Sequence, residues 1–269
     1  MDSNKKIASL VFAAGKGSRM KGYDGNKTLL PLAPEGDDVF QGINPILINI
    51  LGKLPAGTKA LVVNHKKEDV IKATNSFGIS YYEQPELNGT GGAMLAAMDF
   101  IKNEEYDLLL VTMGDTPLVK ASTFMNLLNA LSEYDISILG FCPEDKKKYG
   151  VLDIEGNNVK KIIEWEYWNK FPAARQEELK ICNGGIYAIK KDVIVKYLEL
   201  LSTQPHVVIK ERNGNKVEIK EYFITDMVEM MCNDGLKTGY IVAEDEDEVM
   251  GVDDVDSLKK AQQLFKIYQ

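Results

Sequence analysis

An apolar run followed at once by a glycine-rich basic loop constrains the fold of this chain more than any other feature. Residues 7–12 have the length of one strand and lack the alternation of a half-exposed strand, which suits a central strand covered on both faces. In the loop that follows, Gly15 and Gly17 let backbone N–H groups approach an anion closely, and several basic residues lie nearby. The sequence therefore predicts an α/β fold with a phosphate-binding loop after its first strand.

Three other interpretations fit this segment less well. A dinucleotide-binding loop would place glycine or alanine where this chain has Met20. A P-loop needs glycine, lysine and serine or threonine in direct succession, whereas Asn26 separates Gly25 from Lys27. A cleaved secretory signal would need a longer apolar core than this strand, which runs directly into the basic loop.

The charge and hydropathy of the chain limit its partners. The 269 residues carry a formal net charge of -8, whereas nucleic-acid backbones demand basic surfaces, so we expect no nucleic-acid partner. Residues 16–27 form a local basic cluster within that acidic background, which suits a small anionic ligand. No apolar run approaches the roughly 18 residues of a membrane span, so we expect a soluble protein with no membrane partner.

The cysteines and histidines form no recognisable metal or redox motif. Cys142, Cys182 and Cys232 lie far apart and lack Cys-x-x-Cys spacing, so we expect reduced core thiols and a cytoplasmic location. His65 and His206 are widely separated and lack a ligand partner at helical spacing, so we expect structural or surface roles for both.

Strand-like and helix-like segments alternate through the first half of the chain, which predicts a mostly parallel sheet with helices on both faces. The second half includes a predicted β-hairpin over residues 149–163, which we expect to lie over the sheet as a lid or subdomain. Other strands are expected at residues 61–63, 79–82, 108–111, 184–189 and 239–242. Helices are expected at residues 67–77, 91–102, 122–132, 192–201, 225–233 and 256–267. The predicted fold class is α/β, a Rossmann-like three-layer α/β/α architecture with a mixed, mostly parallel central sheet and a small β-rich subdomain.

Two aspartates are candidates for binding a magnesium ion. Asp115 follows a buried strand and precedes a proline turn, which places it at the edge of the sheet where such folds bind ligands. Mg²⁺ needs only one or two carboxylates when water and substrate phosphates complete its coordination. Asp253 is a plausible second ligand near the start of the last helix, where one neighbouring aspartate is expected to cap the helix. We expect the acidic run over residues 244–248 to be a solvated loop.

A third segment, over residues 83–93, offers groups that suit a nucleotide base. The amide of Gln84 carries a donor and an acceptor together, and Gly89 and Thr90 can present backbone groups at a helix start. Taken alone, this segment fits a polar turn before a helix better than a base-binding segment. The phosphate loop and the candidate magnesium ligands favour the nucleotide interpretation.

These residues together resemble the sugar-1-phosphate nucleotidyltransferases, and among them the uridylyltransferase domain of bacterial N-acetylglucosamine-1-phosphate uridylyltransferases. The resemblance covers nearly the whole chain. The residues similar to the family's signature loop are Ala13, Ala14, Gly15, Lys16, Gly17, Ser18, Arg19 and Met20. The positions that match its other motifs are Lys27 for phosphate, Gln84, Gly89 and Thr90 for uracil, Asp115 and Asp253 for magnesium, and Gly150, Glu164, Asn183 and Thr225 for the sugar and its phosphate.

The resemblance implies a single nucleotidyltransferase domain over residues 1–269. Residues 1–120 would bind mainly the nucleotide, residues 121–253 mainly the sugar, and residues 254–269 would form the C-terminal helix. The resemblance further implies Mg²⁺ as cofactor, with Arg19, Lys16 and Lys27 neutralising phosphate charge during catalysis. No hexapeptide repeats follow, so we expect the acetyltransferase half of bifunctional members to be absent.

Several departures from the family pattern affect the expected substrate rather than the reaction. The differing positions are Leu87, Met113, Val151 and Phe223, and the segments 33–44 and 204–220 look longer than their counterparts. The expected reaction joins UTP to a sugar 1-phosphate, N-acetylglucosamine 1-phosphate first, and releases pyrophosphate. Two alternatives stay open, namely the same reaction with another sugar or alditol phosphate or with CTP, and a non-catalytic nucleotide-sugar sensor. A homo-oligomer is also compatible with the sequence.

Overall fold

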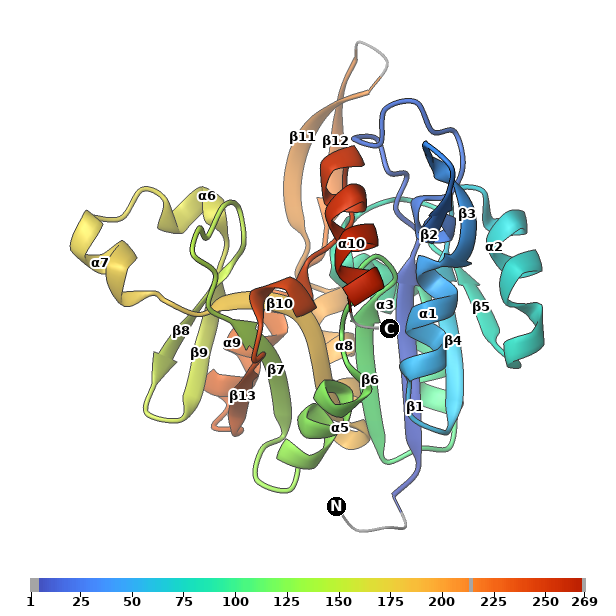
Figure 1. Cartoon of the computed structure of the whole chain (residues 1–269). Coiled ribbons are helices and arrows are strands. Elements are labelled where there is room, and N and C mark those ends of the chain that lie inside the picture. Colours follow the sequence, from blue (N-terminus) through green and yellow to red (C-terminus); the bar gives the residue numbers. More distant parts are fainter. Residues whose placement is uncertain (1–4, 213–214, 268–269) are drawn as a thin grey trace.

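A mixed β-sheet forms the centre of the molecule (Figure 1). The computed structural model describes residues 5–212 and 215–267, and within them nine strands make one sheet with the main order β13-β7-β10-β6-β1-β4-β5. The strands of that order are β13 (Thr238–Val242), β7 (Ile136–Phe141), β10 (Cys182–Lys190), β6 (Leu108–Met113), β1 (Ile7–Ala13), β4 (Thr58–Val63) and β5 (Ser80–Glu83). Strand β10 runs antiparallel to both of its neighbours, while the other pairs along this order are parallel. The structure thus confirms the predicted mixed, mostly parallel sheet.

The register of the first strand brings the loops of the candidate site to one edge of the sheet. Val11 of β1 pairs with Leu61 of β4 on one side and with Thr112 of β6 on the other. Because these strands are parallel, the loops after all three emerge from the same edge. Val11 is fully buried, as expected for a central strand with both faces covered.

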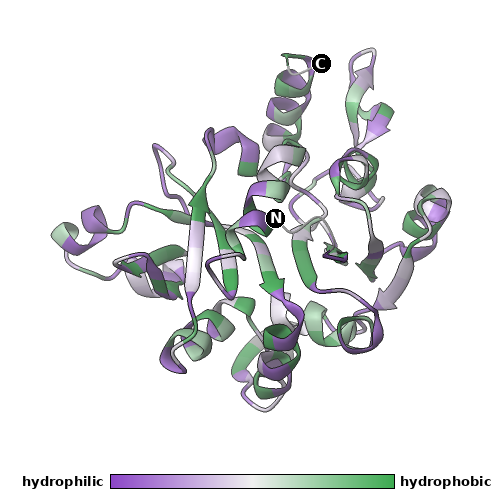
Figure 2. Cartoon of the chain, turned by 90° about the horizontal axis from the view of Figure 1, so that it is seen from below, coloured by the Kyte–Doolittle hydropathy of each residue, from purple (hydrophilic) through white to green (hydrophobic). Residues whose placement is uncertain are grey.

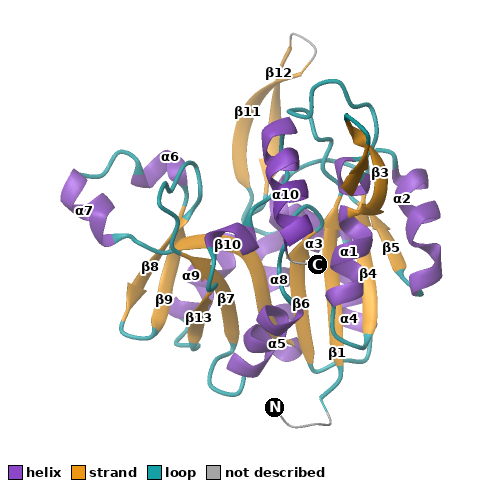
Figure 3. Ribbon diagram, viewed as in Figure 1, coloured by secondary structure: helices purple, strands orange, loops and turns teal. Residues whose placement is uncertain are grey.

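Helices cover both faces of the sheet, as Figure 3 shows. One apolar core contains residues of α4, α8 and α9, including Phe100, Tyr197 and Met227, and the other contains residues of α1 and α5, including Leu47 and Phe124. The helices are α1 (Ile46–Lys53), α2 (Lys67–Thr74), α3 (Gly89–Ala96), α4 (Met98–Asn103), α5 (Ala121–Ala130), α6 (Trp165–Trp168), α7 (Ala173–Glu178), α8 (Lys191–Ser202), α9 (Ile224–Asn233) and α10 (Val255–Ile267). Figure 2 shows hydrophobic segments gathered in the central strands, in line with these two cores. The α/β/α layering predicted from the sequence is therefore confirmed.

Three hairpins extend this framework. Strands β8 (Val151–Glu155) and β9 (Asn158–Ile163) form the predicted hairpin, but β8 pairs with β10, so this hairpin extends the central sheet instead of lying over it as a lid. Strands β2 (Pro31–Glu35) and β3 (Asp38–Pro45) form a hairpin packed on α10 through a small third core. Strands β11 (His206–Arg212) and β12 (Asn215–Glu221) form another, which projects from the body (Figure 1). The last two hairpins lie in the segments that looked long in sequence.

Other differences from the sequence predictions have local causes. The helix expected over residues 91–102 is two helices, because the chain leaves helical geometry at Ala97 (φ -97°, ψ 19°). Strand β7, which is buried throughout, was not predicted. The three cysteines are free, yet only Cys182 is buried and Cys142 is exposed, so the expectation of three core thiols is wrong. Among the described residues, no helix combines the length and apolar character that crossing a membrane requires.

Candidate active site

The glycine-rich loop lies over the side chain of Lys27, which enters the site from the short 3₁₀ turn η1 (Lys27–Leu29). A Cβ atom on Gly17 would lie 3.2 Å from the Lys27 Cβ, and Gly17 has a positive φ of +62°. Both features favour glycine at this position. Lys16 and Arg19 are exposed on the loop, whereas Ala13 and Ala14, which lead into it, are buried. The glycines therefore serve the packing of a lysine as well as any approach of a phosphate.

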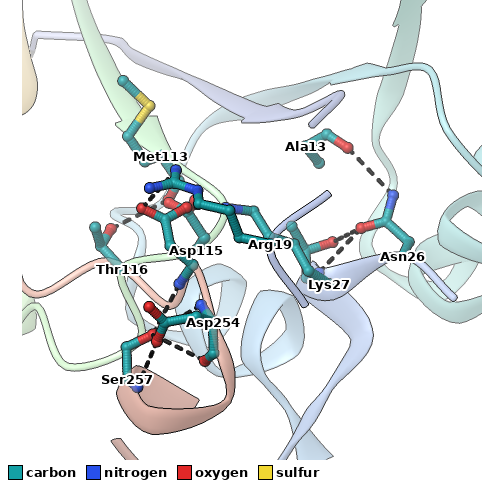
Figure 4. A network of polar contacts seen from close by, with 11 residues as sticks. Ala13, Arg19, Asn26, Lys27, Met113, Asp115, Thr116, Asp254 and Ser257 are labelled. Carbon is teal, nitrogen blue, oxygen red and sulfur yellow. Dashed lines mark hydrogen bonds and ion pairs between the residues drawn. The ribbon is translucent and has the colours of Figure 1, made fainter. Parts of the chain in front are cut away.

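Lys27 joins Asp115 and Asp253, the two aspartates that the sequence predicted as magnesium ligands. Figure 4 labels Lys27, Asp115 and Arg19 in this network. Its Nζ lies 2.5 Å from Asp115 Oδ2 and 2.7 Å from Asp253 Oδ1, and its side chain is only 10% exposed. Arg19 lies 3.1 Å from the other oxygen of Asp253. The backbone amide of Val252 also donates to the carbonyl of Asp115 at 2.8 Å. Two carboxylates from distant parts of the chain thus converge on one cation.

The charge on Lys27 is maintained by these contacts. Burial by itself would lower the pKa of the ammonium, but the nearby carboxylates of Asp115 and Asp253 outweigh that effect and raise the pKa above its ordinary value. Lys27 therefore stays protonated at neutral pH. The site holds a fixed positive charge at the point where the two carboxylates meet.

Asn26 holds Lys27 in place, a role that the sequence analysis missed. Its amide nitrogen donates to the carbonyl of Ala13 at 3.3 Å and to that of His65 at 2.7 Å. Its oxygen accepts hydrogen bonds from the backbone and hydroxyl of Thr28, which caps the 3₁₀ turn. The sequence does carry one signal for this role, because asparagine directly before a short helical segment is a common capping residue. The residue that breaks the P-loop pattern is the anchor of this turn.

A second set of contacts supports the loop that carries Asp115. The side chains of Asn49 and Lys53, both on α1, donate to the carbonyl of Pro117 at 2.7 and 2.8 Å. Burial lowers the pKa of Lys53, with the charge of Glu248 acting in the opposite direction. Helix α1 thereby fixes the backbone two residues after Asp115.

Glu248 corrects the prediction that residues 244–248 form a solvated loop. It is 3% exposed, within the turn η3 (Glu246–Val249). Its Oε1 accepts hydrogen bonds from the backbone of Lys120, at 3.0 Å, and from the hydroxyl of Thr123. This carboxylate ties the segment before Asp253 to the segment after Asp115. Charge patterning could not reveal it, because the burial depends on a partner more than 120 residues away.

The predicted base-binding segment forms a closed turn. Gln84 is 4% exposed, and its amide nitrogen donates to Asn88 Oδ1 at 2.9 Å and to the carbonyl of Gly89 at 3.1 Å. Gly89 has φ +91° and begins α3, as the helix-start prediction requires. Gln84 thus shapes the turn that presents Gly89 and Thr90, and its role in choosing a base stays a prediction.

The predicted sugar-binding residues gather in two pairs. The hydroxyl of Thr225 donates to Glu164 Oε1 at 3.0 Å, and the backbone amide of Asn183 donates to the carbonyl of Gly150 at 2.8 Å. A Cβ on Gly150 would lie 3.3 Å from Glu164 Oε2, which brings the two pairs together. Burial is the main cause that raises the pKa of Glu164 above its ordinary value. The Asn183 side chain is bonded to the Tyr187 hydroxyl and to the amide of Gly185.

The nucleotide and sugar segments are joined through Tyr222. Its amide donates to the carbonyl of Asn88 at 2.9 Å, and its carbonyl accepts from the amide of Gly91 at 2.8 Å. The hydroxyl of Thr90 accepts from the amide of Ile224 at 3.3 Å. A Cβ on Gly89 would come within 2.3 Å of the Tyr222 carbonyl oxygen, so only glycine fits this contact. The residues predicted to bind base and sugar are therefore close neighbours.

A cleft of about 740 Å³ opens between the glycine-rich loop and the start of α10, and the residues predicted to bind base and sugar do not line it. Arg19 and Asp253 contribute to its wall, together with Tyr149, Met250 and Lys260. Space for a ligand thus adjoins the cationic loop and one of the two carboxylates.

Comparisons with known proteins show the family of this chain. A MobA-like NTP transferase domain matches residues 9–209, so the chain belongs to the MobA-like NTP transferase family. The chain is 33% identical over 270 residues to the bifunctional protein GlmU of Sulfurimonas denitrificans, covering 98% of this chain and 54% of that relative. It is 30% identical over 270 residues to the bifunctional protein GlmU of Brucella anthropi, covering 98% and 53%. The chain spans about half the length of these curated relatives.

Solved structures show the same fold. The uridine diphosphate N-acetylglucosamine pyrophosphorylase of Trypanosoma brucei matches with a TM-score of 0.71 and 13% identity, covering 96% of this chain and 65% of that chain. A nucleotidyl transferase from Methanothermobacter matches with a TM-score of 0.62 and 18% identity, covering 99% and 100%. The resemblance to sugar-1-phosphate nucleotidyltransferases and the fold class predicted from the sequence are both confirmed.

Proposed function

We propose that this chain transfers a uridylyl group from UTP to a sugar 1-phosphate, with N-acetylglucosamine 1-phosphate as the first candidate, and releases pyrophosphate. The convergence of Lys27, Asp115 and Asp253 beside the glycine-rich loop carries this proposal. It is supported by relatives that bear the name GlmU and by a structural neighbour that is a uridine diphosphate N-acetylglucosamine pyrophosphorylase. The proposal places the enzyme in the cytoplasm, where UTP is available.

The donor set at this site fits Mg²⁺. Carboxylate oxygens are the ligands that Mg²⁺ prefers, and two of them already converge on a cation, the ammonium of Lys27. The described residues contain no group of three or more His, Cys, Asp or Glu side chains placed to hold a metal, so substrate phosphates and water would complete the coordination. Asp115 and Asp253 would hold the ion. When bound, Mg²⁺ supplies charge neutralisation between the two phosphorylated substrates.

The protein's own groups position the reactants and neutralise their charge. A phosphate oxygen of the sugar phosphate forms a bond to the α-phosphorus of UTP, and the bond from that phosphorus to the pyrophosphate oxygen breaks. The attacking oxygen is already ionised, so no general base is needed. Lys16 and Arg19 are placed on the exposed loop to neutralise the departing pyrophosphate, and Lys27 to neutralise the reacting phosphates.

The remaining predicted residues define the two substrate subsites in this proposal. Ala13, Ala14, Gly15 and Gly17 provide backbone for the triphosphate, and Gln84, Gly89 and Thr90 hold the base. On the other side of Tyr222, Glu164 and Thr225 receive sugar hydroxyls or the acetamido group, with Gly150 and Asn183 completing that wall. Glu164 is partly buried, and Thr225 donates to its Oε1, so the two side chains are positioned together for a binding role in this proposal.

A substrate panel tests the proposal directly. Pyrophosphate release is measured with UTP and CTP against N-acetylglucosamine 1-phosphate, other hexose 1-phosphates and alditol phosphates. We expect the highest kcat/KM with UTP and N-acetylglucosamine 1-phosphate. A preference for another pair would change the substrates but keep the reaction class, and binding of UDP-sugars without any pyrophosphate release would refute catalysis.

A separate variant tests the assignment of Asp115 as a metal ligand. Asp115→Ala removes one of the two converging carboxylates and should lower pyrophosphate release by at least a hundredfold, while the thermal unfolding transition stays cooperative. Glu244→Ala is the matched control, because it removes an exposed carboxylate of the neighbouring segment. A variant that keeps wild-type turnover without Asp115 would refute the role of this residue.

A further inference from the structure

The hairpin β11–β12 brings a histidine to the border between the two proposed subsites. Strand β11 begins at His206, and the hairpin's base is fixed by pairing of His206 with Glu221. The chain then passes directly through Tyr222, the residue bonded to the nucleotide segment. His206 is therefore held at the junction between the two proposed subsites, although it lies far from either in sequence.

Two contacts fix the imidazole of His206. Its Nε2 lies 2.9 Å from Asp226 Oδ2, and its ring meets the ring of Phe223 edge-on, with centroids 5.4 Å apart. Asp226 directly follows Thr225, the residue bonded to Glu164. The side chain of His206 remains 46% exposed, so the contacts orient the ring without burying it.

The surroundings of this histidine include residues assigned to both proposed subsites: Phe223 adjoins Gly89 of the base segment, and Asp226 adjoins Thr225 of the sugar segment. The charge of Asp226 acts on the carboxyl of Glu164, which lies among the predicted sugar-binding residues. Phe223 stands where the resembling family carries a hydroxyl, and a Cβ on Gly89 would lie 3.4 Å from its ring. A phenyl ring cannot donate a hydrogen bond to a substrate, whereas the neighbouring imidazole can donate or accept one.

We propose that His206, oriented by Asp226 and Phe223, binds a polar oxygen of the incoming sugar phosphate. This inference rests on the proposed function and deepens it by naming a residue that selects the second substrate. Three observations carry it: the open face of the imidazole, its carboxylate partner beside Thr225, and its position on a hairpin in one of the segments that looked long in sequence. His206 is then a specificity residue contributed by this chain's own hairpin.

Separate variation of the two substrates tests the role. His206→Phe removes the polar edge but keeps a ring against Phe223, and His206→Asn keeps a hydrogen-bonding side chain. Loss of a hydrogen bond to a charged group corresponds to a rise of about tenfold or more in KM for the sugar phosphate. We expect that rise in His206→Phe, partial recovery in His206→Asn, and KM for UTP within about twofold of wild type.

Val207→Thr is the matched control, because Val207 is the next residue of β11 and is 56% exposed. Circular dichroism melting checks that each variant folds, and calorimetric titration of UTP gives a second measure of the nucleotide subsite. If the wild-type enzyme is active, equal rises in the KM values for UTP and for the sugar phosphate would refute this role of His206. No change in either KM value would refute it as well. A wild-type chain that releases no pyrophosphate with any substrate pair would instead refute the proposed function itself.

Discussion

Replacement of Lys27 by methionine should change turnover and metal binding in opposite directions. Methionine keeps an unbranched apolar stem but removes the ammonium that lies 2.5 Å from Asp115 and 2.7 Å from Asp253. Among the described residues, Arg19, at 3.1 Å from Asp253, would then be the remaining ion-pair partner of the two carboxylates. We expect Lys27→Met to lose turnover and, at the same time, to bind a divalent metal more tightly in the absence of nucleotide.

The size of each effect follows from the geometry. At an effective dielectric constant of about 20, each contact contributes a gross attraction of about 6 kcal/mol. Desolvation offsets most of this, and Asp253 is 40% exposed, so the free energy of unfolding should fall by only about 2 kcal/mol. Loss of one charge-stabilising donor commonly lowers kcat by about 100-fold to 1,000-fold. Removing a competing cation from two carboxylates should tighten metal binding by about tenfold, or about 1.4 kcal/mol.

Two measurements test the reasoning. Electron paramagnetic resonance of free Mn²⁺ gives metal affinity without nucleotide, and pyrophosphate release gives turnover. Lys21→Met is the matched control, because it makes the same charge change on an exposed residue of the same loop. Suppose that Lys27→Met binds Mn²⁺ no more tightly than wild type while the control is unchanged. That result would refute the idea that the ammonium of Lys27 occupies the cation position.

Two further predictions address Gly89, in the turn proposed to hold the base, and the partly buried carboxyl of Glu164 in the proposed sugar subsite. Gly89→Ala should lower the melting temperature and raise KM for UTP, because its Cβ would meet the Tyr222 carbonyl at 2.3 Å; Gly78→Ala, with φ +63° and open space around it, measures the backbone cost alone. An equal effect of both changes would show that the contact with Tyr222 is unimportant. Because burial raises the pKa of Glu164, this carboxyl contributes most stability below its unfolded pKa and loses it as pH rises through its folded pKa. Glu164→Gln should therefore flatten the decline of stability above about pH 4.5 in urea titrations, and an unchanged slope would contradict this.

Local features of the chain were sufficient to predict most strands of the central sheet, although β7 was missed. The unbroken apolar run of β1 indicated a strand buried on both faces, and Val11 is indeed fully buried. The Gly156 turn indicated the hairpin β8–β9, and Gly156 has φ +61°. Such signals depend only on residues that are close in sequence, so they hold whatever the arrangement of the rest of the molecule. Ala97 shows the limit, since an alanine-rich segment gives no local sign that its helix is interrupted there.

By itself the sequence determined the glycine-rich loop, the aspartate at the end of a central strand, and the candidate residues for binding the base and the sugar. These follow from residue type and spacing, which act over a few positions along the chain. Only the tertiary structure decided that Lys27 joins Asp115 and Asp253, which lie 88 and 226 residues from it. It also decided that Glu248 is buried and that His206 lies beside Asp226. Burial and charge pairing depend on which distant segments pack together, and no local pattern encodes that choice.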